Sequence, residues 1–343
     1  MKLLILGDLH FGEKGDSPKH NAQLLELIDH ICEEHEGKVD AVVQLGDWYH
    51  QRNKIQLSTL NRGIEGAEKL STAFGDDNVY VLTGNHDIPH RDSLRDSSLI
   101  SISHLVNIID KPTTLGNCFL VPWIITDEDW NTAVEGSENH SYLLAHLELN
   151  GFLMNDYYVM EHGQSGKELR DYTKVFTGHY HSYQEQGNII YTGTPIPMSH
   201  NEANRDMGYW LLDTDTGDYE FVVYDKVRVV SIPYDELEDV IPTLDPHNTS
   251  IRVEFPDDLE DETLITDVSD VLMEMNFSDV KMKYKGNKAK QLLEIDVGEV
   301  EEVENIDASV VQFIKNATLV EGIKASLLES LYKEAKNMET MND

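Results

Sequence analysis

Three apolar runs of strand length each end at a glycine that is followed by side chains able to bind a metal ion or move a proton. The runs are residues 2–6, 39–45 and 79–83. The side chains that follow them are Asp8, His10, Asp47, His50, Asn85 and His86. Because open α/β sheets build their sites at the carboxyl ends of strands, we expect these side chains to meet in one cluster.

Two further pieces lie downstream. His146 follows the apolar run 142–145, and Gly178-His179-Tyr180-His181 follows the run 175–177. The chain thus offers seven oxygen or nitrogen donors, which are Asp8, His10, Asp47, Asn85, His146, His179 and His181. Seven donors suit two metal ions that share one carboxylate, and this mixture fits manganese, iron or zinc better than calcium or magnesium. Two such ions can activate water and hold a phosphoryl group for in-line displacement.

Each motif alone is weak evidence. A lone Asp-x-His arises by coincidence, and Gly-Asp after a strand is usually only a turn. Gly84-Asn85-His86-Asp87 and Gly-His-x-His are rarer, and all four motifs in this order at strand ends are hard to explain by chance. The other histidines, His20 and His200 among them, are expected to be solvated or on helix surfaces.

Helical patterns alternate with these strands in the first half of the chain. Ser17-Pro18 predicts the start of a helix that ends near Gly37, and Ser58 predicts the cap of a second helix that ends at Gly75. Residues 93–105 are also helix-like. This alternation of strands and helices predicts an α/β layer architecture.

The rest of the chain is richer in strands and then changes pattern. Strand-like runs are expected at 118–123, 142–145, 174–177, 188–192, 209–213 and 219–224. After Val227 we expect strand 249–255, helix 261–275, strand 279–285 and strand 291–297. An acidic segment and a helical tail (306–338) follow. The predicted domains are residues 1–225, 226–298 and 299–343.

Composition indicates a globular protein without a membrane span. Hydrophobic residues make up 40% of 343, and no run approaches the roughly 18 apolar residues that a span requires. A disulfide framework is not expected from only two cysteines, Cys32 and Cys118, so we expect a reducing, cytoplasmic location. The formal net charge of −36 should repel a polyanion from most of the surface. Either the substrate is not a polyanion, or bound cations and a partner supply positive charge; a saline host would also favour such a surface.

The motifs resemble the signature of calcineurin-like metallophosphoesterases over residues 1 to about 200. They are Asp8-x-His10, Gly46-Asp47, Gly84-Asn85-His86-Asp87, His146 and Gly178-His179-x-His181. Where the protein phosphatases carry Gly-Asp-x-Val-Asp-Arg-Gly, this chain has Gly46-Asp47-Trp48-Tyr49-His50, which is similar to the SbcD-type DNA repair nucleases. Residues 110–114 and 146–152 look most like the recombination endonuclease subunits of T-even-like bacteriophages.

The resemblance implies a fold class and a set of roles. The fold would be α/β, a metallophosphoesterase β-sandwich flanked by helices, with a small α+β capping domain and a C-terminal helical tail. By resemblance, the first metal ion is held by Asp8, His10, Asp47 and His181, and the second by Asp47, Asn85, His146 and His179. His86 would face the scissile phosphate and stabilise or protonate the leaving oxygen. His50 would assist from across the cleft, or would only stack beside Trp48 and Tyr49.

The resemblance also implies a function and partners. The chain would be a DNA exonuclease and endonuclease with two divalent metal ions, manganese being expected. It would act on double-strand ends and single strands as the nuclease subunit of an SbcCD-like complex in the host cytoplasm. Its tail would dock on an SbcC-type coiled-coil ATPase or pack back on the capping domain, and a homodimer is expected in the complex. A small-molecule phosphodiesterase and a non-catalytic scaffold subunit are the alternatives.

Lysines gather in one stretch of the predicted capping domain. Lys281, Lys283 and Lys285 alternate with apolar residues, so on a strand they would share one face. We expect this face either to contact DNA phosphates or to protect the edge of a sheet, which is a common use of lysine.

Overall fold

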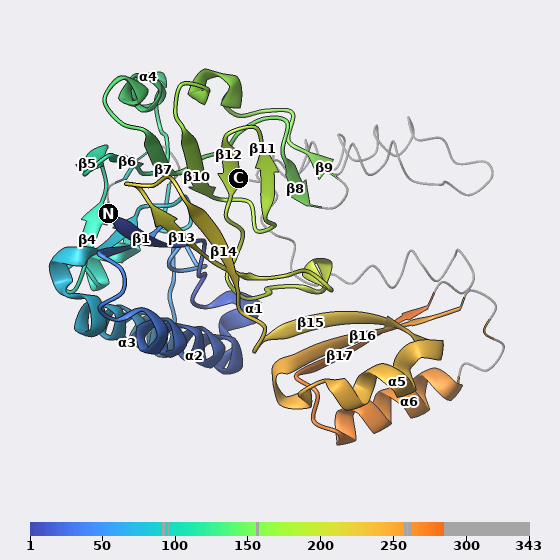
Figure 1. Cartoon of the computed structure of the whole chain (residues 1–343). Coiled ribbons are helices and arrows are strands. Elements are labelled where there is room, and N and C mark those ends of the chain that lie inside the picture. Colours follow the sequence, from blue (N-terminus) through green and yellow to red (C-terminus); the bar gives the residue numbers. More distant parts are fainter. Residues whose placement is uncertain (91–92, 95, 156–157, 257–258, 260–262, 285–343) are drawn as a thin grey trace, which may run out of the picture. The chain divides into compact units, whose positions relative to one another are not determined.

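Two six-stranded mixed sheets lie face to face and form the body of the molecule (Figure 1). The structure, a computed structural model, describes residues 1–284 except 91–92, 95, 156–157, 257–258 and 260–262. All of these belong to the first of two units, Met1–Gly286. The predicted strand at 291–297, the acidic segment and the helical tail lie outside the described residues.

The first sheet has the strand order β14-β13-β1-β2-β3-β4. Its strands are β1 (Lys2–Leu6), β2 (Ala41–Gln44), β3 (Val79–Leu82), β4 (Asn107–Ile109), β13 (Gly208–Asp213) and β14 (Tyr219–Val223). β1 to β4 run parallel, whereas β13 pairs antiparallel with β1 and with β14. The first three predicted strands are therefore neighbours whose carboxyl ends lie at one edge.

The second sheet has the strand order β11-β12-β10-β7-β6-β5. Its strands are β5 (Thr113–Leu115), β6 (Cys118–Val121), β7 (Tyr142–His146), β10 (Lys174–Gly178), β11 (Gln184–Gln186) and β12 (Ile189–Tyr191). The four central strands are parallel, and β5 and β11 are antiparallel edges. A separate ribbon joins β8 (Leu153–Asn155) and β9 (Tyr158–Val159).

Alternation along β1 explains the layers. Leu3 and Ile5 point into the core between the two sheets, whereas Leu4 and Leu6 belong to the core beneath the helices. That second core is completed by α2 (Pro18–His35) and α3 (Leu57–Phe74). A strand with both faces buried is apolar at every position, which is why 2–6 reads as a continuous run.

Helices cover both outer faces of the sandwich. α2 and α3 lie on one side and α4 (Asp127–Glu135) on the other (Figure 1). As predicted, the Ser17 side chain caps α2 by accepting from the His20 N–H, and Pro18 occupies the first turn. The short α1 (Glu13–Asp16) precedes it.

Two helix predictions are wrong. α3 begins at Leu57 with Gln56 at the cap position and no side-chain cap, so Ser58 is not the cap. Residues 93–105 form only one 3₁₀ turn, Ser98–Ser101, in the described part. Serine side chains there bond to the nearby backbone, since the Ser97 hydroxyl accepts from the Leu99 N–H, and such local bonds compete with a helix.

A third, parallel sheet has the order β15-β16-β17 and a core of its own. Its elements are β15 (Arg228–Pro233), α5 (Leu237–Val240), β16 (Thr249–Phe255), α6 (Thr263–Glu274) and β17 (Asp279–Tyr284). The predicted strand 249–255 is confirmed, and the helix predicted at 261–275 is observed over Thr263–Glu274. This is the predicted α+β element, while the domain boundary at 225 stays a prediction. None of the described helices has the length and apolarity that a bilayer crossing demands.

Two glycines in α3 provide a matched test of its packing. A Cβ at Gly63 would overlap the ring of Tyr49, which is fully buried. The Tyr49 hydroxyl donates to the Leu60 carbonyl and lies at hydrogen-bond distance from the Ser101 hydroxyl. A Cβ at Gly66 would meet the flexible end of Ile28 at 2.9 Å and the buried ring of Phe11 at 3.1 Å.

We expect Gly63→Ala to lower the free energy of unfolding by about 1–3 kcal/mol, because the tyrosine ring cannot move aside. Gly66→Ala should stay within about 1 kcal/mol of the wild type, because the higher helix propensity of alanine offsets the smaller displacement of Ile28 and Phe11. Urea unfolding of the two variants measures both, and equal destabilisation would contradict the assignment.

Candidate metal centre

Five strand ends from both large sheets deliver the predicted ligands to one place. Asp8 and His10 follow β1, Asp47 follows β2, and Asn85 follows β3. From the second sheet come the last residue of β7 and the segment after β10, which carry His146, His179 and His181. Asp8, His10, Asp47, Asn85 and His146 are each at most 1% exposed. The structure therefore brings together all seven residues singled out in the sequence.

The backbone around the ligands is unusual. His10, Asp47 and His179 have positive φ angles of 50°, 56° and 99°, a region that side chains other than glycine seldom adopt. The motif glycines permit close approach, since a Cβ at Gly84 would overlap Asp47 and one at Gly178 would overlap Asp8. Strained residues persist where the surroundings fix them, and they cluster at functional sites.

One group of potential ligands consists of Asp8, His10 and His181. One ligand atom of each lies within 4.8 Å of the others. The Nε2 atoms of His10 and His181 are 3.1 Å apart. Burial lowers the pKa of His10 well below its usual value, which favours the neutral imidazole that binds metals. Burial and the neighbouring Asp47 carboxylate raise the pKa of Asp8.

A second group consists of Asp47, His146 and His179, again with ligand atoms within 4.8 Å of one another. Asn85 joins it, because its Oδ1 lies 2.9 Å from His146 Nε2 and 2.9 Å from His179 Nδ1. Burial lowers the pKa of His146 to about 3. The His146 Nδ1–H donates to the Leu45 carbonyl at 2.8 Å, so Nε2 is the lone-pair nitrogen that faces the group.

Asp47 lies between the two groups. Its Oδ2 atom is 3.6 Å from His10 Nε2 and 3.5 Å from His146 Nε2. Its other oxygen accepts from the His86 N–H at 2.8 Å. One carboxylate oxygen thus points at both sets of imidazoles, as a bridging ligand would.

The residues fit divalent cations. Asp8 and Asp47 are buried carboxylates whose ion-pair partners, within the described part of the chain, are histidines. Buried carboxylates need compensating positive charge. The lone pairs of the oxygen and nitrogen donors point at one another and would repel unless a cation lay between them. Carboxylate, amide and imidazole donors of this kind suit borderline transition metals.

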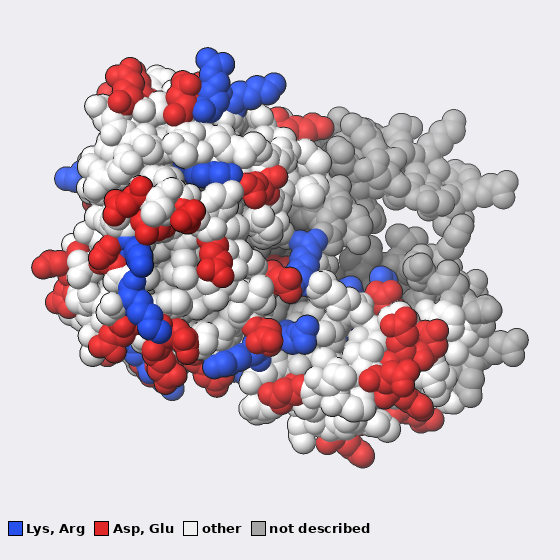
Figure 2. Space-filling view, in the orientation of Figure 1, with Lys and Arg blue, Asp and Glu red and all other residues white. Residues whose placement is uncertain are grey.

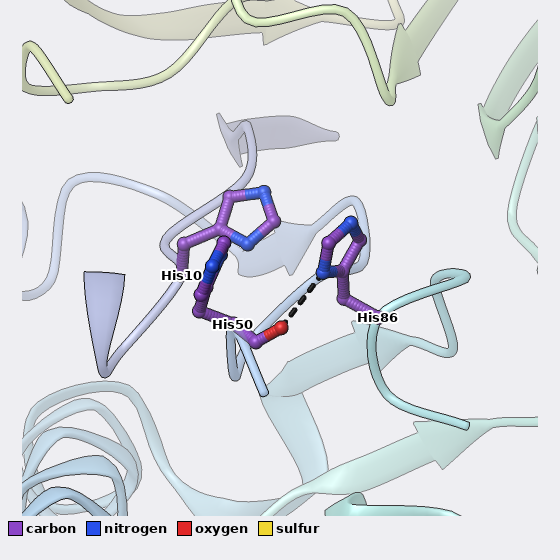
Figure 3. Close-up of side chains that lie close together, drawn as sticks. All are labelled: His10, His50 and His86. Atoms are coloured by element: carbon purple, nitrogen blue, oxygen red, sulfur yellow. Dashed lines mark hydrogen bonds between the residues drawn. The ribbon is translucent and has the colours of Figure 1, made fainter. Parts of the chain in front are cut away.

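The ring of His86 lies beside the metal groups, next to the rings of His10 and His50. Figure 3 shows it with His10 and His50, and its Nδ1–H donates to the His50 carbonyl at 2.7 Å. The rings of His50 and His86 stack at 5.3 Å, and His10 meets His86 edge-on at 4.8 Å. Burial lowers the pKa of His86 to about 4. His50 therefore packs on His86, while Trp48 and Tyr49 belong to the core beneath the helices.

Asp87 has a role that the sequence did not reveal. Its carboxylate is fully buried and accepts four backbone N–H groups. Oδ2 accepts from Asp47 at 2.8 Å and from Gly84 at 2.9 Å, and Oδ1 accepts from Trp48 at 3.0 Å and from Tyr49 at 3.2 Å. Burial and the Asp47 charge raise its pKa, and the backbone donors oppose that shift. Asp87 thereby joins the loops that follow β2 and β3.

Three further carboxylates lie close to histidines of the site, and the sequence analysis did not predict them. The contacts are Glu13 to His50 Nδ1 at 2.5 Å, Glu148 to His179 Nε2 at 3.6 Å, and Glu202 to His181 Nδ1 at 4.0 Å. Of these histidines, the proposed ligands His179 and His181 have a carboxylate near their second nitrogen, at distances longer than a direct hydrogen bond. Glu13 and Glu148 lie three and two residues after motif histidines, which is a usable signal, whereas Glu202 lies on a remote segment.

Two histidines predicted to be solvated are buried. His20 is 1% exposed on the inner side of α2, and burial lowers its pKa to about 3. His200 is 9% exposed, and its Nε2 lies 2.8 Å from the Asp279 carboxylate. Helical periodicity explains His20, since it shares the inward face with Leu24 and Leu27.

Known proteins similar to this chain include phosphoesterases and a phage exonuclease subunit. Residues 1–231 match the calcineurin-like phosphoesterase family. The chain is 30% identical over 233 residues to exonuclease subunit 1 of Enterobacteria phage T4, covering 65% of this chain and 67% of that protein. Among solved structures, an archaeal phosphodiesterase matches at 14% identity and a TM-score of 0.34, over 65% of this chain and 100% of the other. A predicted phosphoesterase from Streptococcus pneumoniae matches at 14% identity and a TM-score of 0.27, over 65% and 92%.

Asp87→Asn tests the connection between the two loops. An amide presents one acceptor oxygen and directs an N–H₂ group at backbone donors, so we expect the free energy of unfolding to fall by about 2 kcal/mol or more. Asp77→Asn, at an exposed position, is the control and should change stability by less than about 0.5 kcal/mol. Urea unfolding compares them, and equal stability of both variants would remove this role from Asp87.

Proposed function

Because this chain belongs to the calcineurin-like phosphoesterase family, we propose that it hydrolyses DNA as a two-metal exonuclease and endonuclease. The observation that carries the proposal is the position of Asp47 Oδ2 between two groups of imidazoles. The similarity to a phage protein named as an exonuclease subunit supports a nucleic acid as the substrate, which we propose to be DNA.

The proposed ligands divide between two ions, with manganese as the proposed metal. Asp8, His10, Asp47 and His181 would hold the first ion, and Asp47, Asn85, His146 and His179 the second. Bound cations at this place supply Lewis acidity toward the phosphate and lower the pKa of water. The buried loops hold the donors close together, which would reduce the cost of ordering them around cations.

His86 and His50 would act on the phosphate. The Nδ1 proton of His86 is engaged by the His50 carbonyl, so Nε2 is the nitrogen that would face the substrate. Neutral His86 can only accept a hydrogen bond there, and it donates one to the leaving oxygen when it is protonated. A developing negative charge favours that protonated form. His50 stacks on His86 and would orient it.

The two alternatives differ in what they would cleave. A small-molecule phosphodiesterase would use the same metal groups, and a scaffold subunit would cleave nothing. The complete ligand set with His86 beside it favours catalysis, and the exonuclease-like relative favours DNA. Cleavage of linear duplex and circular single-stranded DNA with manganese, compared with hydrolysis of cyclic nucleotides, separates the three.

We propose the partners from the relative and from the sequence. The phage relative is named a subunit, which supports assembly with a second protein. For this chain we propose an SbcC-type coiled-coil ATPase, docked by the segment 306–338, and a homodimer within the complex in the host cytoplasm. The docking segment lies outside the described residues.

Chemistry and metal binding should be separable. His86→Ala is expected to reduce DNA cleavage by about 100-fold or more while the metal content stays at two ions, because the imidazole would act on the phosphate. Asp47→Ala should lose both ions, because it is the shared ligand. Elemental analysis with a cleavage assay measures this, and equal metal loss in both variants would refute the role division.

Lysines of the third sheet offer a test of DNA binding. Lys281 and Lys283 lie on β17, which pairs only with β16 among the described strands, and Lys283 contacts Glu254 at 3.0 Å. Lys285 lies outside the described residues.

Replacing Lys281, Lys283 and Lys285 by glutamine should flatten the log-log salt dependence of DNA binding by up to about 3 units, at roughly 0.9 per phosphate contact. The control replaces the three lysines 38, 111 and 167. Filter binding across salt concentrations gives the slopes. An unchanged slope would contradict DNA binding by the β17 lysines and would support the alternative that they protect a sheet edge.

A further inference from the structure

Glu13 is a buried carboxylate that contacts a histidine of the proposed site. It is 7% exposed, and its Oε2 lies 2.5 Å from His50 Nδ1. A buried carboxylate is costly unless it is paired. The His50 imidazole therefore offsets part of the free-energy cost of burying the Glu13 charge.

The turn that presents Glu13 is firmly anchored. Gly12 has a φ of 99°, and the Glu13 N–H donates to the His10 carbonyl at 3.0 Å. The Gly12 N–H donates to Asn21 Oδ1 at 2.9 Å, and the Asn21 amide donates to Thr59 at 3.1 Å. The turn is thus joined to α2 through Asn21 and to α3 through Thr59, so Glu13 approaches His50 from a fixed position.

His50 lies between Glu13 and His86. Its backbone N–H donates to the Phe11 carbonyl at 3.0 Å, which fixes the main chain. Its ring stacks on His86 with an interplanar angle of 26°, and its carbonyl accepts from His86 Nδ1. A rotation of the His50 ring would therefore change the surface on which His86 rests.

We propose that Glu13 is a positioning residue that fixes the tautomer and ring orientation of His50 during phosphodiester hydrolysis. The proposal rests on the proposed function and adds a residue to it. A carboxylate oxygen 2.5 Å from Nδ1 favours the form with the proton on that nitrogen, because two facing lone pairs would repel each other. Nε2 is then the nitrogen that keeps the lone pair. No proton need reach Glu13 in this role.

Kinetics of the full-length protein with manganese and bis-p-nitrophenyl phosphate test this. Glu13→Ala should lower kcat by about 10-fold to 100-fold, because a misdirected catalytic group costs that much. KM should change by less than about twofold, since ground-state binding is not affected. Glu13→Gln should recover part of kcat, because its amide oxygen can still accept from Nδ1–H.

A double-mutant cycle distinguishes positioning from a structural effect. In a His50→Ala background, Glu13→Ala should cause no further loss of kcat, because the two residues act as a unit. Metal content should equal that of the wild type, and Glu33→Ala, an exposed acidic position on α2, serves as the charge control. Equal loss of kcat in both backgrounds, or loss of metal from Glu13→Ala, would overturn the proposal.

Nitrogen NMR of the imidazoles gives a readout that does not depend on activity. At one fixed pH, the His50 signal, assigned by its absence in His50→Gln, should report a protonated Nδ1 in the wild type and a mixture of tautomers in Glu13→Ala. An identical His50 signal in both proteins would refute the role of Glu13. If the wild type cleaves neither DNA nor the small ester, the proposed function fails, while this spectrum still decides the position of the His50 proton.

Discussion

The site depends on one buried carboxylate that makes no contact with substrate or metal in the proposed arrangement. Asp87 accepts four backbone N–H groups from the loops after β2 and β3. Without this anion, those N–H donors would lie unpaired in the interior. The hydrogen bond that stabilises Asp47 at its positive φ of 56° would also be lost. Because one Asp47 oxygen is engaged by the His86 N–H, the other is directed at the imidazoles. The arrangement of the metal groups follows from this backbone network.

The second constraint is the packing of the two large sheets. His146 and His179 come from the second sheet, so the ligand set is complete only when the sheets lie at the right distance. The core between them sets that distance, with Leu3 and Ile5 from β1 facing Leu144 and Phe176. Near the site the contact becomes close enough that a Cβ at Gly46 would meet His146 Nδ1 at 2.5 Å. Folding and ligand assembly are thus one event, which is why the site can be built from residues far apart in the sequence.

Sequence patterns predicted those features that local chemistry controls. Apolar runs followed by glycine predicted the central strands, and the rule for parallel strand ends predicted that the ligands meet in one cluster. The helix proposed at 93–105 failed because serine side chains there bond to the local backbone. The burial of His200 was missed because it depends on Asp279, which is far away in the chain.

The supporting carboxylates show the same limit. Nothing in the spacing of His181 and Glu202 predicts their contact, because a 3₁₀ turn (His200–Glu202) from another segment returns to the site. The sequence identified Asp87 only as the last residue of the motif Gly84-Asn85-His86-Asp87. Its four hydrogen bonds exist because the loop after β2 folds against the loop after β3. Local pattern identifies residues that bind or react, whereas residues that hold them in place are identified by long-range geometry.

The strong negative charge of the chain opposes the approach of a phosphodiester. Figure 2 shows acidic side chains spread over the visible face, with basic side chains in separate groups among them. Lys283, one of the few cations of the third sheet, lies against Glu254, which lessens its attraction for a phosphate. At the site itself, Asp8 and Asp47 add buried negative charge. A phosphodiester would therefore meet repulsion until cations reverse the local sign, so in this chain metal binding would control substrate approach as well as chemistry.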